Sequence, residues 1–250
     1  MKAILIGATS GIGKELARRF IGKGWTVGLC GRRGKELENI METYGTDKVC
    51  IAALDVTGEE SADTLDGLLE RFGAPDLFLY VSGVGYQNRE LDEDKELRTV
   101  RTNCEGMVRM TTHFINYVRK HPETYSKEHK AHIAVVTSVA GTAGLGTAPA
   151  YSASKKMEST YVSALAQLAA MESYPVFFSD IRPGFVQTGL LREDKSYPLT
   201  MTVEKAADCI IRGLERRKRV ITFDWRYRTI VFFWRLIPAR LWERIKFVKI

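Results

Sequence analysis

The chain is 250 residues long, with 45% hydrophobic and 27% charged residues and a formal net charge of +7. This composition is ordinary for one folded globular domain, and it excludes a disordered chain. The charge is uneven, because residues 216–250 hold a net charge of +9 and the other residues hold −2. The sequence therefore predicts a near-neutral domain with a basic C-terminal segment.

Met1 leads directly into "KAILIGATSGIG", so we expect no secretory signal and a cytoplasmic protein. No two cysteines form a C-x-x-C pair, and we interpret them as buried thiols in a reducing compartment. The histidines show no ligand spacing, so we expect them at the surface and predict no metal site. These residues are Cys30, Cys50, Cys104, Cys209, His113, His121, His129 and His132.

Seven short apolar runs alternate with stretches of helical periodicity. The runs lie at 2–6, 26–30, 49–54, 76–81, 132–138, 176–181 and 220–223. The helical stretches begin near Ile12 and cover about 34–44, 59–71, 92–119, 151–172 and 203–216. Continuous apolar runs separated by helices indicate parallel strands buried on both faces. We predict a doubly wound, seven-stranded parallel α/β sheet of the Rossmann type over residues 1–222, with a ligand crevice at the carboxyl ends of the strands.

A glycine-rich loop, "GATSGIG", joins the first strand to the first helix. Gly7, Gly11 and Gly13 permit backbone angles that side chains forbid, and they let amide groups approach a pyrophosphate at the positive end of the helix dipole. Three glycines alone would fit any tight turn. Their place between a strand and a helix favours dinucleotide binding.

The second strand ends in "CGRR", with Gly31 where an acidic residue would bind the ribose of NAD. Arg32 and Arg33 follow, and guanidinium groups pair well with a 2′-phosphate. NADP is therefore favoured over NAD, the alternative being that both arginines only solvate the next helix. Asp55, after the third strand, would accept from the adenine amino group or cap the helix beyond it.

"YSASK" places Tyr151 and Lys155 four residues apart, on the same face of a predicted helix. A free phenol is a poor proton donor near neutral pH, and a nearby ammonium favours its ionised form. Ser138, at the end of a strand that faces the same crevice, could bind a substrate oxygen. Taken alone, Tyr151 and Lys155 could also be an ordinary solvated pair.

Together these motifs resemble the short-chain dehydrogenase/reductase family. The resemblance covers most of residues 2–222 and rests on "GATSGIG", "LDV", "RTNCEG", "VVTSVAG", "YSASK" and "RPGFVQT", in the family's order. It implies that Tyr151 is the acid/base and Lys155 its tuner, that Ser138 holds the substrate oxygen, and that Asn103 holds a water in a proton relay. The expected cofactor-binding residues are Gly7, Thr9, Ser10, Gly11, Ile12, Gly13, Arg32, Arg33, Asp55, Val56, Gly83, Tyr151, Lys155, Pro183, Gly184, Val186 and Thr188.

The chain departs from the family after the fourth strand, where "YVSGVG" stands in place of Asn-Asn-Ala-Gly. The asparagine that normally braces the central strands is missing, and Gly83 alone fits a close backbone approach to the cofactor. The segment after Thr188, "GLLREDKSYPL", reads as a mobile substrate lid. The family resemblance also implies a homodimer or homotetramer built on the helices near 92–119 and 151–172.

Residues 223–250 form an aromatic and basic extension that the family core does not require. Ile230, Phe233, Trp234, Ile237 and Leu241 could form one apolar helical stripe, which Pro238 would interrupt or continue as a second helix. The stripe would pack on the protein itself or a partner subunit, or lie in a membrane interface. Nucleic-acid binding is the least favoured interpretation.

The sequence thus predicts an NADP-preferring oxidoreductase that interconverts an apolar carbonyl and a secondary alcohol. The alternative is a protein that binds NAD(P) as a sensor and has lost turnover, with contact to a membrane surface through its extension. The intact set of Ser138, Tyr151 and Lys155 favours the enzyme.

Overall fold

Seven parallel strands form the centre of the computed structural model, which describes residues 1–189, 197, 199–223 and 225–245. The strands are β1 (Lys2–Ile6), β2 (Thr26–Gly31), β3 (Val49–Ala53), β4 (Leu77–Tyr80), β5 (Ala131–Val136), β6 (Val176–Arg182) and β7 (Val220–Thr222). They lie in the order β3-β2-β1-β4-β5-β6-β7. The order reverses between β1 and β4, where a doubly wound sheet opens its ligand crevice. The predicted Rossmann-type fold is confirmed.

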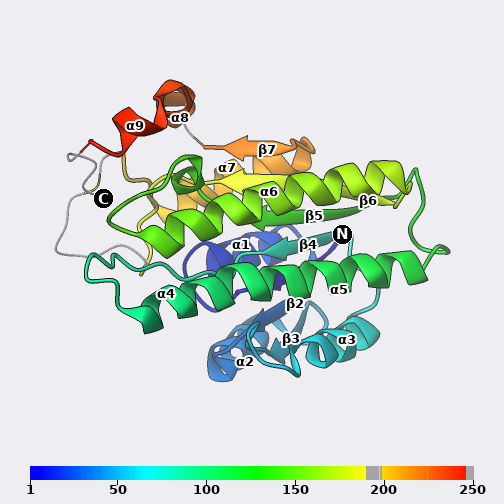
Figure 1. Cartoon of the computed structure of the whole chain (residues 1–250). Coiled ribbons are helices and arrows are strands. Elements are labelled where there is room, and N and C mark those ends of the chain that lie inside the picture. Colours follow the sequence, from blue (N-terminus) through cyan, green and yellow to red (C-terminus); the bar gives the residue numbers. More distant parts are fainter. Residues whose placement is uncertain (190–196, 198, 224, 246–250) are drawn as a thin grey trace.

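Helices cover both faces of this sheet (Figure 1). They are α1 (Gly11–Gly22), α2 (Gly34–Tyr44), α3 (Ser61–Phe72), α4 (Glu93–Val100), α5 (Gly106–Lys120), α6 (Pro149–Met171) and α7 (Val203–Glu215). One buried cluster joins the sheet to α1, α2 and α7, and the other joins it to α3, α5 and α6. Along β1, Ala3 and Leu5 enter the first cluster and Ile4 and Ile6 the second, as the two-residue period of a strand requires.

The single helix predicted near 92–119 is interrupted. A π-helical segment, η1 (Arg101–Glu105), stands between α4 and α5. Such a segment inserts one extra residue into a helix and is frequent at functional sites. It contains Asn103, which is fully buried.

The expectation that all histidines lie at the surface is wrong for His132. This residue belongs to β5, is 6% exposed, and its Nε2 lies 2.8 Å from Ser179 Oγ. Burial, aided by Arg217, lowers the pKa of His132 to about 4. Only Cys30 is a fully buried thiol, since Cys50, Cys104 and Cys209 are half-buried. Among the described residues, no group of three or more His, Cys, Asp and Glu could hold a metal ion.

The C-terminal extension forms two helices, α8 (Trp225–Leu236) and α9 (Ala239–Trp242), with Pro238 directly before α9. They lie at the end of the molecule toward which β7 points (Figure 1). The predicted apolar stripe is not one buried face. Ile230, Trp234 and Ile237 are half-buried, whereas Phe233 is 58% and Leu241 57% exposed.

Candidate active site

The glycine loop after β1 is built by close backbone contacts. Gly7 has a φ of +100°, and a Cβ there would lie 2.6 Å from the backbone nitrogen of Ser82. A Cβ on Gly13 would lie 2.0 Å from the carbonyl oxygen of Gly7. The first turn of α1 holds no acidic residue, and Ser10 at its N-cap makes no side-chain capping bond. This cradle and the positive end of α1 fit the pyrophosphate of a dinucleotide.

The predicted adenosine side of the site comes together at the ends of β2 and β3. Arg33 Nη2 donates to Thr9 Oγ1 at 3.0 Å, and Arg32 Nη1 lies 4.0 Å from Asp55 Oδ2. Asp55 also accepts two hydrogen bonds from Thr57, at 3.0 and 2.8 Å. Burial by itself would raise the pKa of Asp55, but the Thr57 bonds and Arg32 outweigh it and hold this pKa below its usual range.

Asp55 does not cap the following helix, because Glu60 occupies the N-cap of α3. The capping interpretation of Asp55 is therefore wrong. Val56 is buried beside it, and its side chain lies against Gly106 at the start of α5. Both arginines remain exposed at the end of β2.

Tyr151 and Lys155 share one face of the first turns of α6. Lys155 Nζ lies 5.9 Å from the centre of the Tyr151 ring. The ring of Tyr151 rests against Gly85, where a Cβ would lie 2.6 Å from its Cδ2. A Cβ on Gly83 would lie 3.3 Å from Lys155 Nζ, so the loop after β4 passes directly beside the ammonium.

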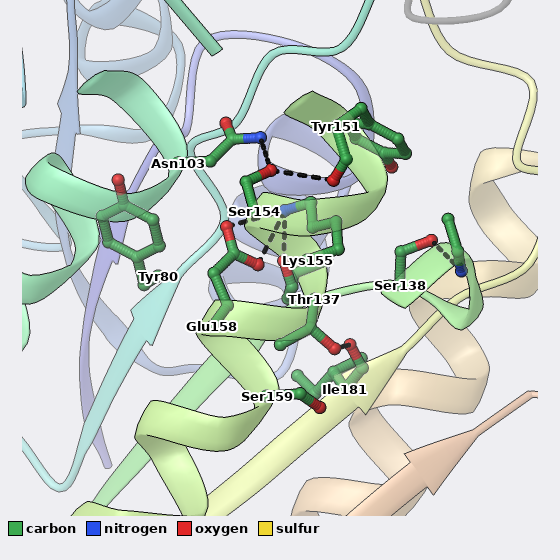
Figure 2. Close-up of polar contacts among 12 residues, drawn as sticks. Tyr80, Asn103, Thr137, Ser138, Tyr151, Ser154, Lys155, Glu158, Ser159 and Ile181 are labelled. Carbon is green, nitrogen blue, oxygen red and sulfur yellow. Dashed lines mark hydrogen bonds and ion pairs between the residues drawn. The ribbon is translucent and has the colours of Figure 1, made fainter. Parts of the chain in front are cut away.

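Ser138 reaches the same end of the sheet from the end of β5 (Figure 2). It stands at the N-cap of a short 3₁₀ helix, η2 (Val139–Thr142), and its Oγ accepts from the Ala140 N–H at 3.1 Å. Its contact to the Pro183 carbonyl oxygen is long, at 3.5 Å. The Ser138 hydroxyl hydrogen is therefore held weakly enough to turn toward another acceptor.

Asn103 braces the loop after β4. Its Nδ2 donates to the Val84 carbonyl at 2.8 Å and to Ser154 Oγ at 2.9 Å, and its Oδ1 accepts from the Val84 N–H at 2.8 Å. Ser154 Oγ in turn donates to the Tyr151 carbonyl at 2.8 Å (Figure 2). Asn103 thus ties the loop and α6 together, in a chain that lacks the family's usual asparagine after the fourth strand.

Glu158 is the main residue that sequence reasoning missed. It lies one turn beyond Lys155 on α6, is fully buried, and accepts from Lys155 Nζ at 3.0 and 2.9 Å. The missed signal was its spacing, since Tyr151, Lys155 and Glu158 recur at i, i+4 and i+7 on one helical face.

The predicted nicotinamide side follows β6. The Pro183 carbonyl accepts a hydrogen bond from the Val139 N–H at 3.0 Å, and Val186 is buried. The Thr188 side chain lies beside Gly11, where a Cβ would be 3.2 Å from it. The loop after β6 therefore reaches back to the glycine loop. The predicted lid falls mainly on residues 190–196 and 198, which lie outside the described residues.

A model of the family described as short chain dehydrogenase matches residues 1–198. The chain belongs to the short-chain dehydrogenase/reductase family. The resemblance drawn from the motifs is confirmed, and the chain is an NAD(P)-dependent oxidoreductase.

Curated relatives of this short-chain dehydrogenase/reductase are distant. Dehydrogenase/reductase SDR family member 7B of Xenopus tropicalis is 26% identical, over 87% of this chain and 75% of the relative. The Danio rerio protein of the same name is 29% identical, over 75% of this chain and 61% of its own length. An uncharacterized oxidoreductase of Mycobacterium tuberculosis is 25% identical, over 97% of this chain and 96% of the relative.

Solved structures share the fold of this family member. A short chain dehydrogenase from Burkholderia cenocepacia in complex with NADP superposes with a TM-score of 0.79 at 19% identity, covering 97% of this chain and 94% of that one. ElxO with NADP bound gives a TM-score of 0.77 at 18% identity, covering 91% and 98%. A family member from Burkholderia phymatum in complex with NAD gives 0.78 at 19% identity, covering 92% and 91%.

Proposed function

We propose that this oxidoreductase prefers NADP(H) and interconverts a carbonyl and a secondary alcohol. The observation that carries the proposal is the stacking of Lys155 one helical turn beneath Tyr151, with Ser138 at the same end of the sheet. Reduction of a carbonyl requires a proton at the developing alkoxide, and a phenol beside an ammonium can provide it. The nicotinamide cofactor, when bound, supplies the hydride.

Each of the three side chains has a separate task in this proposal. The Tyr151 hydroxyl gives its proton to the substrate oxygen, and the Lys155 ammonium stabilises the phenolate that remains. The Ser138 hydroxyl, weakly held toward Pro183, donates to the same substrate oxygen and stabilises its charge. We assign Asn103 to a proton relay to Lys155, as the family resemblance implies, and its bonds to Val84 and Ser154 fix the elements on either side.

The same residues predicted from the motifs would hold the cofactor. The pyrophosphate would lie on the glycine loop with Thr9, Ser10 and Ile12, and the adenosine beside Asp55 and Val56. The loop after β6, with Pro183, Gly184, Val186 and Thr188, would hold the nicotinamide side.

The exposed guanidinium groups of Arg32 and Arg33 favour NADP over NAD. NADP in the ElxO and Burkholderia cenocepacia structures supports this preference, while the NAD complex from Burkholderia phymatum keeps NAD within the family's range.

An apolar carbonyl compound suits the surroundings of Ser138 and Tyr151. The loop from Gly141 to Gly146 holds only small residues besides Leu145. Residue Trp242 of α9 contacts this loop, since its indole Nε1 donates to the Gly144 carbonyl at 2.7 Å. The loop itself contributes no charged side chain, so it offers shape and apolar contact to a substrate.

A homodimer or homotetramer through α4, α5 and α6 is part of the proposal. Large apolar side chains are exposed on α4 and α6: Leu97, Val100, Leu168 and Met171. Replacement of Leu168 and Met171 by arginine should lower the mass measured by sedimentation if α6 lies at the interface, and should leave it unchanged if it does not.

The decisive experiment is a screen of NADPH oxidation over steroids, quinones, aldehydes and ketoacyl compounds, with Tyr151→Phe as the matched variant. We expect Tyr151→Phe to bind NADPH like the wild type, measured by fluorescence, and to lose about 10²- to 10⁴-fold in kcat. Binding without turnover in the wild type, across the whole panel, would favour the sensor. Comparable rates in both proteins would remove Tyr151 from the mechanism.

A further inference from the structure

The Lys155 ammonium contacts Glu158 and the carbonyl of Val136 on the buried side of α6. It donates to the two carboxylate oxygens of Glu158, at 3.0 and 2.9 Å, and to the Val136 carbonyl at 3.1 Å. Two of the three acceptors belong to one carboxylate, so Glu158 is the main partner of this ammonium. Lys155 is 4% exposed and Glu158 is 0% exposed, so the pair is closed off from solvent.

Because the pair is buried, the charge of each member is stable only while the other is charged. Two opposite charges in an interior attract strongly, but each loses its hydration, and removal of one leaves the other charged and unpaired. A lysine in that position tends to give up its proton. Glu158 therefore decides whether Lys155 stays an ammonium, and Lys155 is the group that faces Tyr151.

Other titratable groups lie near enough to Glu158 for their charges to interact with it. They are Tyr80 on β4, Cys104 in η1 and Asp180 on β6. The Asp180 carboxylate is paired with Arg182 at 2.6 Å. Lys155 is the cation that contacts the Glu158 carboxylate, and none of these other three groups could replace it.

We propose that Glu158 is a positioning residue of the active site, whose buried carboxylate keeps Lys155 protonated and fixes its ammonium beneath Tyr151 (Figure 2). Tyr151, Lys155 and Glu158 then act as a phenol, an ammonium and a carboxylate in line along one helical face. The consequence for catalysis rests on the proposed function, in which Tyr151 is the proton donor.

The charges in this cluster agree with that role. Burial by itself would lower the pKa of Lys155, but Glu158 and Tyr151 outweigh it and hold the pKa above its usual range. Burial raises the pKa of Glu158 to about 7, against the attraction of Lys155. Removal of the Glu158 charge lowers the pKa of every group beside it, because the loss of a nearby anion makes each remaining proton easier to release.

The test is an NMR titration of full-length protein carrying [ε-¹³C]lysine, with the Lys155 signal assigned by its absence in Lys155→Met. We expect Lys155 in Glu158→Gln to titrate about one pH unit or more below the wild type. Glu158→Asp, which keeps the charge at a longer distance, should fall between the two. Glu172→Gln is the control, because it removes the same charge from the exposed end of α6, about 25 Å along the helix from Lys155.

Unchanged titration of Lys155 in folded Glu158→Gln would overturn the proposal. If that variant does not fold, Glu158→Asp decides, since a Lys155 titration equal to wild type in this variant would also overturn it. The titration uses neither substrate nor cofactor. A wild type that titrates as expected but reduces no carbonyl would therefore refute the proposed function alone.

A second measurement separates charge from packing. With any carbonyl that the wild type reduces, the basic limb of kcat/KM against pH should move down by about one unit in Glu158→Gln, because the cluster loses its protons at lower pH. The KM for NADPH should change less than kcat. A fall in kcat with an unmoved basic limb would show a purely structural role and would contradict the proposal.

Discussion

The phenol oxygen of Tyr227 accepts a hydrogen bond from the backbone N–H of Phe185 at 3.1 Å, and its ring lies directly against Gly184. Helix α8 is thereby attached to the loop that follows β6. The attachment explains why the C-terminal extension reaches the candidate active site, although the family core does not require it.

A side chain at position 184 should separate these two elements. A Cβ on Gly184 would lie 2.1 Å from Tyr227 Cζ, so Gly184→Ala must push α8 away. We expect a loss of about 1–3 kcal/mol in stability, measured by thermal denaturation, and faster proteolysis after residue 222. Gly22→Ala is the control, because a Cβ there meets nothing within 4 Å. Equal proteolysis of both variants would contradict the contact.

Arg33 should matter for NADPH more than for NADH. A guanidinium that pairs with a 2′-phosphate contributes charge-assisted hydrogen bonds, so Arg33→Ala should raise the KM for NADPH about 10- to 100-fold and change that for NADH little. Arg119→Ala, on α5, removes the same charge at a distance and serves as the control. A matching rise for NADH would show that Arg33 acts on the loop through Thr9 and does not select the cofactor.

His132 should make stability fall on the acid side of neutrality. Its pKa is about 4 in the folded protein against 6.5 for the ordinary group, so the unfolded chain takes up the proton first as pH falls from 6.5 to 4. The expected loss over this window is about 3 kcal/mol, and it should level off below pH 4.

Urea denaturation at several pH values tests this contribution. His132→Asn should be less stable than the wild type at pH 7, and the difference between the two should shrink toward pH 4. His129→Asn, at a position 56% exposed, should follow the wild-type curve. A wild type and His132→Asn that differ equally at every pH would refute the assignment.

The outer face of α8 should attach the protein to anionic membranes. Large apolar side chains are exposed there and on α9, among basic residues: Trp225, Phe232, Phe233, Leu236, Leu241, Arg235, Arg240 and Arg244. No helix among the described residues is long and apolar enough to cross a bilayer. An apolar face flanked by arginines suits a position in the headgroup region.

Flotation with vesicles containing phosphatidylserine checks this expectation. The wild type should float with the vesicles, and salt should weaken its binding. A protein with Phe232, Phe233 and Leu236 all changed to serine should stay in the bottom fraction of the gradient. Leu91→Ser alters an exposed apolar residue before α4, away from α8 and α9, and should float normally. If the α8 variant floats as well as the wild type, α8 is not the attachment site.

The sheet, and the meeting of Ser138, Tyr151 and Lys155 at one end of it, were predictable because their signals are local. Each buried strand is a continuous apolar run, and "GATSGIG" and "YSASK" place their side chains by spacing along one turn or helix. Contacts between distant segments had no such signal. The Tyr151 ring packs against Gly85, and the Tyr227 ring packs against Gly184. Both contacts join residues that are distant in the sequence and that only the fold brings together.

Two residues show a different limit, since His132 was misjudged and Glu158 was missed. His132 is the second residue of an apolar strand, yet histidine is polar on average, and its bond to Ser179 compensates for its burial. Glu158 lies on the same helical face as Lys155, but a lysine and an acidic residue three positions apart usually form an exposed ion pair. Burial of both, which local sequence does not reveal, changes the meaning of the spacing.

The π-helical segment at Arg101–Glu105 joins α4 to α5 and fixes the rotation of one helix relative to the other. Each residue turns an α-helix by about 100°, so deletion of one residue in the segment would swing α5 by that angle relative to α4. Asn103 could then no longer reach Val84 and Ser154 while Met107 and Phe114 stay in the core. The extra residue acts as a spacer, and insertions or deletions should be tolerated worse here than at any exposed turn of the same helix.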